Sequence, residues 1–206
     1  MRQMRWMSAA CLGGLLVVMG CMGKQGGSAV PASPESKHKL DIENPASSRV
    51  DRGKYLVTVL ACNDCHTPFK LTPTGPAPDM AKMLSGHPEG FKITKLPQPD
   101  PVWIMSGTGT NTAFAGPWGV SFAANLTPDK VSGMGSTWDE ARFIKAMRTG
   151  RHFGEARPIL PPMPWHGLSQ ATDEDLKSIW AYLQSIPAIK NEVPSAIPPT
   201  GAGSLR

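Results

Sequence analysis

The sequence lacks concentrated charge. Charged residues make up 18% of the 206 positions, and the net charge is +5, from 21 basic and 16 acidic side chains. Every acidic residue follows position 21, so removal of residues 1–20, with Arg2 and Arg5, leaves an excess of only three basic groups. No run of Lys and Arg interleaved with aromatic residues occurs, and this excludes nucleic acid as the expected partner.

The sequence also lacks an apolar run long enough to cross a bilayer. Ala9–Met19 is apolar over only eleven residues and follows Arg2 and Arg5, a pattern typical of an export signal. It ends in "VVMGC", which resembles the lipobox of bacterial lipoproteins, so we expect residues 1–20 to be removed and Cys21 to be lipidated. The alternative is an ordinary signal peptide cut later, near "GGSAVPAS". Both alternatives predict an exported domain, and the lipobox places it at the periplasmic face of a bacterial membrane.

Cysteine is scarce, with four in the chain, and two of these lie together in "ACNDCHTP" at residues 61–68. Cys62, Cys65 and His66 are consistent with a disulfide, a redox dithiol, part of a zinc site or a haem attachment site. Zinc needs four ligands at characteristic spacing, and the closest histidine pair, His152 and His166, is 14 positions apart. This spacing disfavours zinc.

The two remaining thiol interpretations account for less of the motif. A thioredoxin-like dithiol is expected at the start of a helix, where the dipole stabilises a thiolate, whereas Cys62 follows the end of a predicted helix. A disulfide between Cys62 and Cys65 stays open, but it closes a very small loop and leaves His66 without a role. Haem attachment uses all three residues, because two thiols form thioethers with the vinyl groups and the histidine binds iron.

A second feature supports the haem interpretation, at residues 159–168, "ILPPMPWHGL". Met163 is flanked by prolines that restrict the backbone, and a thioether is a suitable sixth ligand for low-spin haem iron. The alternative is a core methionine in a proline-rich loop. The rival iron ligands are Met134, for which apolar packing is the alternative, and His152 or His166, either of which would give bis-histidine ligation. His38 lies in the expected tether, and His87 is expected to be structural. Candidates for lining the haem pocket or binding a propionate, with ordinary packing as the alternative, are Asn125, Trp118 and Trp165.

With both motifs in place, residues 50–187 resemble the class I cytochromes c, including cytochrome subunits of bacterial dehydrogenases. The resemblance rests on CNDCH, on "LTPDKVSGMGSTWDEARFIKAMRTG" and on "ILPPMPWHGLSQATDEDLKSIWAYLQSIP". It implies a mainly α fold, one covalently bound haem c held by Cys62 and Cys65, and iron ligands His66 and Met163. It also implies a close crossing of the first and last helices at Gly53, with Trp180 or Leu183 opposite.

The chain is expected to contain a signal peptide at 1–20, a flexible tether at 21–48, the cytochrome domain at 49–187 and a flexible tail at 188–206. Three helices are predicted. The first covers residues 50–61, and its apolar side consists of Tyr55, Leu56, Val59 and Leu60. The second covers residues 138–149 and is capped by Thr137, and the third is capped by Thr172 and stopped by Pro187. Residues 67–136 hold ten prolines and nine glycines. We expect them to form a long loop-rich insertion between the haem motif and the middle helix, with short strands at "FKITKL" and "VWIM".

The first functional hypothesis is a membrane-tethered electron carrier that is not itself an enzyme and has no small-molecule substrate. Its expected partners are redox proteins such as a dehydrogenase, an oxidase or another cytochrome. The alternative is the electron-accepting cytochrome subunit of a periplasmic dehydrogenase or oxidase complex. A third hypothesis is a gas-binding or peroxide-reactive haem with an open sixth position, which carbon monoxide binding to the reduced protein would reveal.

Overall fold

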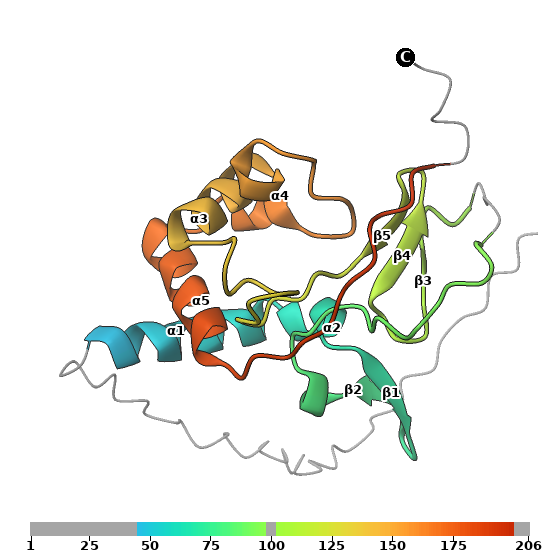
Figure 1. The fold of residues 1–206 in the computed structure, drawn as a ribbon, viewed down its shortest axis with the longest axis horizontal. Coiled ribbons are helices and arrows are strands. Elements are labelled where there is room, and N and C mark those ends of the chain that lie inside the picture. Colours follow the sequence, from blue (N-terminus) through green and yellow to red (C-terminus); the bar gives the residue numbers. More distant parts are fainter. Residues whose placement is uncertain (1–44, 98–101, 200–206) are drawn as a thin grey trace, which may run out of the picture. The chain divides into compact units, whose positions relative to one another are not determined.

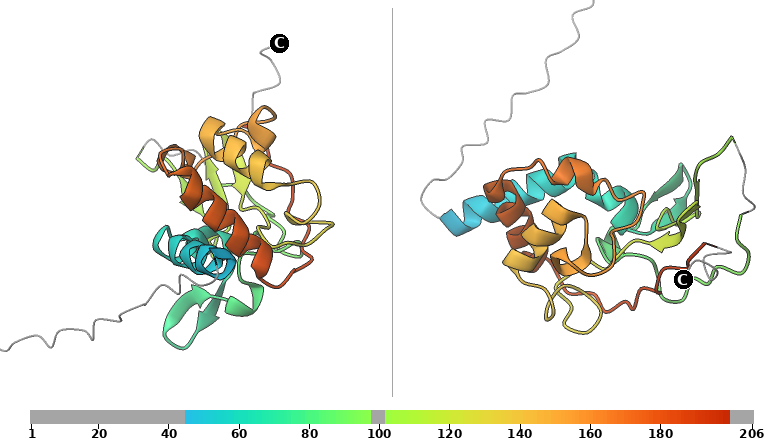
Figure 2. Two further views of the ribbon diagram at one scale, coloured as in Figure 1. Left: turned by 90° about the vertical axis from the view of Figure 1, so that its left-hand side faces the viewer. Right: turned by 90° about the horizontal axis from the view of Figure 1, so that it is seen from above.

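The computed structural model describes residues 45–97 and 102–199, with side chains from residue 48 onward. All of these belong to one compact unit, and their arrangement is drawn in Figures 1 and 2. The α-helices of the described residues are α1 (Pro45–Val59), α2 (Cys62–His66), α3 (Glu140–Thr149), α4 (Trp165–Leu168) and α5 (Asp173–Ser185). The strands are β1 (Phe69–Thr72), β2 (Gly75–Pro78), β3 (Ser106–Gly107), β4 (Ala113–Gly116) and β5 (Gly119–Phe122).

Helices α1 and α5 cross in close contact, and Gly53 lies at the crossing. A Cβ at Gly53 would collide with the carbonyl of Ser178 and lie 2.7 Å from the Cβ of Tyr182. The predicted crossing at Gly53 is therefore confirmed, although Ser178 and Tyr182, not Trp180 or Leu183, lie opposite. Ion pairs from Arg49 to Glu174 and from Arg52 to Asp175 flank the crossing.

The predicted apolar side of α1 is wrong for three of its four residues. Tyr55, Val59 and Leu60 are exposed, while Val57 is 1% exposed and belongs to the core with Gly53 facing α5. Val57 and Val59 are the same residue type on opposite faces, so the identity of the side chains does not reveal which face is buried. The small size of Gly53 decides the face, because only there can the two backbones approach.

Helices α3 and α5 begin and end at residues that satisfy their terminal backbone groups. Asp139 accepts a hydrogen bond from the backbone of Arg142, so it caps α3 in place of the predicted Thr137. Gly150 ends α3 in the left-handed conformation. Thr172 accepts from the backbone of Asp175, as predicted, and α5 ends at Ser185, before Pro187.

The predicted mainly α class I cytochrome c fold with a loop insertion is wrong, because residues 67–136 contain two antiparallel sheets. In the described part of the chain, 34% of residues are helical and 14% are in strands. β1 pairs with β2, and β3–β4–β5 form a three-stranded sheet. The strands lie outside the predicted "FKITKL" and "VWIM" segments. Each of the hairpins β1–β2 and β4–β5 has a two-residue turn, at 73–74 and 117–118, followed by a glycine with positive φ, Gly75 and Gly119.

Residues 188–199 correct the expectation of a flexible tail beginning at Ala188. The backbone of Ile197 pairs with Val120 at the edge of β5. The side chain of Asn191 is buried and donates to the carbonyl oxygens of Ser85 and His87, at 2.7 and 2.9 Å. The rest of the predicted tail, residues 200–206, lies outside the described residues.

The core lies where α1, α3 and α5 meet the start of the insertion. It consists of Val57, Leu84, Met134, Phe143, Ala146, Met147, Leu176, Ile179, Tyr182, Leu183 and Ile186. In Figure 1 these helices lie on one side of α2 and the sheets lie on the other, so α2 is placed at the junction. No helix among the described residues has the length and apolar character needed to span a membrane.

Candidate functional site

Helix α2 carries all three residues of the cysteine–histidine motif on a single turn. The chain enters it through Ala61, whose φ of 56° breaks the path of α1, and the backbone of Asp64 donates to Ala61. Thr67 closes the other end, because its buried hydroxyl donates to Asn63 and accepts from the backbone of Leu84. Both ends of this short helix are thus fixed by hydrogen bonds, which holds Cys62, Cys65 and His66 on one rigid element.

The imidazole of His66 has one ring nitrogen engaged by the backbone. Nδ1 lies 2.8 Å from the carbonyl oxygen of Ala124, and since a carbonyl only accepts, Nδ1 must carry the proton. The lone pair is therefore on Nε2, which makes no hydrogen bond to another described residue. Burial lowers the pKa of His66, and the hydrogen bond to Ala124 opposes this effect. A neutral ring with its other nitrogen bonded to a carbonyl is the usual form of a metal-binding histidine.

The two thiols of α2 are free and half-buried. Burial raises the pKa of Cys62 to about 11 and also raises that of Cys65, with Asp64 adding to both. Cys62 packs against the core, so its sulfur lies in apolar surroundings. The structure contains no disulfide between these two cysteines, and both remain available to bond to another group.

The loop that contains Met163 is connected to the same part of the insertion as His66. The hydroxyl of Ser121 donates to the carbonyl of Pro161 at 2.5 Å, and three residues later Ala124 accepts from His66. Three residues span at most about 10 Å, so the two predicted iron ligands belong to segments held close to one another. Met163 itself is half-buried and packs against the core, as Cys62 does.

The rival ligands occupy other positions. Met134 is 5% exposed and lies in the core, which confirms the packing interpretation for it. His152 packs on Trp138, and burial together with the charge of Arg157 lowers its pKa to about 4. His166 stacks on the indole ring of Trp165, with centroids 3.7 Å apart. His38 and the predicted lipidation site, Cys21, lie outside the described residues.

The other residues considered for the haem pocket make structural contacts. Asn125 is buried and donates to the carbonyl of Ile189, which holds the C-terminal segment. Trp118 donates to Ser121 at 3.3 Å, and Trp165 covers Gly150, where a Cβ would clash with its ring. Sequence reasoning did not identify Ala124, whose role lies in its backbone carbonyl. No residue-type signal can reveal such a role.

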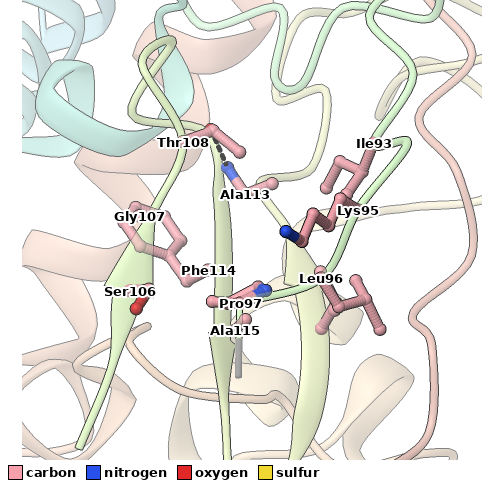
Figure 3. Close-up of a pocket in the computed structure, with 11 residues that line it drawn as sticks. Ile93, Lys95, Leu96, Pro97, Ser106, Gly107, Thr108, Ala113, Phe114 and Ala115 are labelled. Atoms are coloured by element: carbon pink, nitrogen blue, oxygen red, sulfur yellow. Dashed lines mark hydrogen bonds between the residues drawn. The ribbon is translucent and has the colours of Figure 1, made fainter. Parts of the chain in front are cut away.

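A pocket of about 430 Å³ lies beside the three-stranded sheet and is shown in Figure 3. The segment 93–97 forms one wall, and β3, β4 and β5 form the other. Its lining is mainly apolar, with Lys95 as its charged residue. None of the predicted haem residues lines it, so this pocket is separate from the α2 site.

The residues around α2 fit a covalently attached haem better than a bare metal ion. No group of three or more His, Cys, Asp or Glu side chains able to hold a metal occurs among the described residues. A haem brings four nitrogen ligands of its own and needs only axial ligands from the protein. The free thiols, the Nε2 lone pair of His66 and the apolar surroundings provide the groups that such a cofactor requires.

Comparison with known proteins gave relatives that are cytochrome or other subunits of bacterial dehydrogenases. The fructose dehydrogenase cytochrome subunit of Gluconobacter japonicus is 26% identical over 185 residues, which cover 90% of this chain and 29% of that protein. The gluconate 2-dehydrogenase cytochrome c subunit of Pantoea cypripedii is 37% identical over 70 residues, or 33% of this chain and 15% of that protein. A nicotinate dehydrogenase subunit of Pseudomonas putida is 33% identical over 79 residues, or 38% of this chain and 6% of that protein.

The chain thus spans less than a third of the length of each of these relatives. No family model matches the chain. The similarity supports a cytochrome with a role in electron transfer.

Proposed function

We propose that this protein is the electron-accepting cytochrome subunit of a bacterial dehydrogenase and carries one haem c bound through Cys62 and Cys65. The observation that carries the proposal is the geometry of α2, where two free thiols adjoin a histidine whose Nδ1 is fixed on the Ala124 carbonyl. The names of the relatives supply the electron-transfer role and the dehydrogenase partner.

Each residue of the site has a separate task in this proposal. The sulfurs of Cys62 and Cys65 would hold the cofactor through thioether bonds, and the Nε2 atom of His66 would bind its iron. The sulfur of Met163 would also bind the iron, while the core that packs on Cys62 and Met163 excludes water. When bound, the haem supplies a one-electron ferric–ferrous couple, and the chain itself performs no bond-making chemistry on a substrate.

The same residues would serve a membrane-tethered electron carrier that is not part of a complex, so the choice between subunit and carrier depends on the relatives. Two of them are named as cytochrome subunits of dehydrogenases. This favours the subunit over the free-standing carrier. Co-purification with a dehydrogenase would support it, whereas quantitative recovery as a monomer that exchanges electrons with many partners would favour the carrier.

The proposal includes export and attachment to the periplasmic face of a membrane by a lipid on Cys21. Its basis is the sequence "VVMGC", preceded by the basic and apolar stretch of residues 1–20. The proposed tether would then be shorter than residues 21–48, because α1 already begins at Pro45. Mass spectrometry of the N-terminal peptide tests this, because acylated Cys21 is expected, and an unmodified N-terminus beyond residue 21 would contradict it.

The haem itself is tested by acid–acetone extraction and a pyridine haemochrome assay. One Cys-x-x-Cys-His motif occurs in 206 residues, so one haem per chain should remain on the polypeptide after extraction. The double variant Cys62→Ala, Cys65→Ala should lose covalent haem. A parent protein that releases its haem into the solvent, or contains none, would overturn the proposed function.

A further inference from the structure

The insertion makes direct hydrogen bonds to both sides of the His66 site. The backbone of Gly86 donates to the carbonyl of His66 at 2.8 Å, and the backbone of His87 donates to the carbonyl of Ala123 at 2.9 Å. The turn at residues 84–87 therefore bridges the backbone of His66 and the backbone of Ala123. The next residue, Ala124, provides the carbonyl that accepts the hydrogen bond from the His66 ring.

Gly86 lies against the acceptor carbonyl with no room for a side chain. A Cβ there would be 2.6 Å from the carbonyl carbon of Ala124 and 2.7 Å from its oxygen. It would also be 2.5 Å from the carbonyl oxygen of Ala123. The φ of Gly86 is 78°, a conformation that L side chains rarely adopt. The position of the Ala124 carbonyl thus depends on the absence of a side chain at residue 86.

The side chain of His87 closes a ring of hydrogen bonds that holds this turn. Its Nε2 donates to the carbonyl of Phe91, so its Nδ1 must accept from the hydroxyl of Thr112, at 2.9 Å. The carbonyl of Thr112 accepts from the backbone of Ala123, whose own carbonyl accepts from the backbone of His87. His87 is fully buried, and the ring of Phe122 packs on it with centroids 4.8 Å apart.

Thr112 continues into a row of hydroxyl groups along the turn between β3 and β4. Because its hydroxyl donates to His87, it must accept from Thr110, and Thr110 then accepts from Thr108. Thr108 also accepts from the backbone of Ala113, the hydrogen bond drawn in Figure 3. The hydrogen bonds at His87 are thus anchored in the three-stranded sheet.

We propose that Gly86, His87 and Thr112 are positioning residues for the iron ligand His66, and that the insertion sets the reduction potential of the haem through the Ala124 carbonyl. The inference rests on the proposed function. A stronger Nδ1–H···O bond makes the imidazole a better electron donor, which favours ferric iron. Displacement of the Ala124 carbonyl weakens this bond and favours ferrous iron.

The test compares reduction potentials of the intact holoprotein and its variants. Gly86→Ala should move the ferric–ferrous equilibrium toward ferrous iron by about threefold to tenfold, and a tenfold change corresponds to 59 mV for one electron. Exchange of the His66 Nδ1 proton with solvent, measured by NMR, should become faster. Gly90→Ala is the matched control, because no atom lies within 4 Å of a Cβ there, and it should leave both quantities unchanged.

A second pair of variants decides the question if Gly86→Ala does not fold. Thr112→Val removes the hydroxyl that donates to His87 and should raise the potential, while Thr112→Ser keeps the hydroxyl and should restore it. The inference alone would be overturned if the parent protein carries attached haem but neither Gly86→Ala nor Thr112→Val changes its reduction potential or the exchange of the His66 Nδ1 proton. A parent without attached haem would overturn the proposed function, and the inference with it.

Discussion

At the level of single residues, the proposed iron ligand Met163 would decide whether a bound haem acts as an electron carrier or reacts with small ligands. It lies in a loop between Pro162 and Pro164, and the backbone of Trp165 donates to its carbonyl at 2.9 Å. Ser121 holds the preceding Pro161 carbonyl. A weak sulfur ligand benefits from such restriction, because little conformational entropy remains to be lost when it binds.

We predict that Met163→Ala lowers the reduction potential and opens the haem to carbon monoxide, because a soft ligand that favours ferrous iron is lost. The weak sulfur-to-iron absorption band of the ferric protein should disappear, and the half-buried site should lose only about 1–2 kcal/mol of stability. Met134→Leu and His166→Ala are controls that should retain the band. Loss of the band in either control, with retention in Met163→Ala, would contradict the ligand assignment.

His152 should make stability depend on pH in the acidic range. Its pKa of about 4 in the folded chain lies below the ordinary value of 6.5, because burial and Arg157 disfavour the charged form. Between these values the unfolded chain binds the proton and the folded chain does not, so stability falls as the pH falls. Denaturant unfolding between pH 4 and pH 7 should show this fall, and His152→Gln should reduce it.

Arg157→Gln provides a second check on the same residue. Removal of the neighbouring positive charge should raise the pKa of His152 in the folded chain. The interval between this pKa and the ordinary value then becomes smaller, so less stability should be lost as the pH falls. An unchanged pH profile in both variants would show that His152 does not control acid stability.

Among the helices, the crossing of α1 and α5 is the contact most sensitive to a single atom. We predict that Gly53→Ala destabilises the protein by about 1–3 kcal/mol, because its Cβ meets the backbone of Ser178 and forces the helices apart. Chemical denaturation measures the change. Gly167→Ala in α4 is the matched control, since its Cβ meets no atom within 4 Å, and it should change stability by less than about 0.5 kcal/mol.

The helices of this fold could be predicted from the sequence far better than its strands. Thr172, the acidic first turn and Pro187 act within one helix, and local signals of this kind predicted α5 correctly. The strands of residues 67–136 are two to four residues long and depend on partners such as Ile197, which is far away in sequence. Likewise, the spacing of the two cysteines and the histidine is enough to predict a candidate site, whereas the hydrogen bond between His66 and the Ala124 carbonyl depends on tertiary structure alone.

Across the whole molecule, the C-terminal segment connects parts of the insertion that are distant from it in sequence. Asn191 accepts from the backbone of Glu89 and donates to two carbonyls of the turn that carries Gly86. Its own backbone donates to Ser132 at 2.8 Å. One side chain therefore joins the last described segment to the turn that positions the His66 site.

We predict that Asn191→Ala destabilises the protein by about 2–4 kcal/mol, because it leaves the buried carbonyls of Ser85 and His87 without a donor. Thermal or denaturant unfolding measures this change. Ser195→Ala, at an exposed position of the same segment, should have almost no effect. Equal stability of the two variants would show that residues 188–199 are not required for the fold.

Because α1 packs against α5, it has to wait for its partner while the chain is synthesised. Arg52 is translated 123 positions before Asp175, its partner in the structure. At about 5–20 residues per second, this interval lasts roughly 6–25 s. The core that covers Cys62 includes Leu176 and Ile179 of α5, so it cannot form during this interval. The cysteine thiols therefore leave the ribosome uncovered, and any enzyme that modifies them meets an accessible segment before the finished chain encloses it.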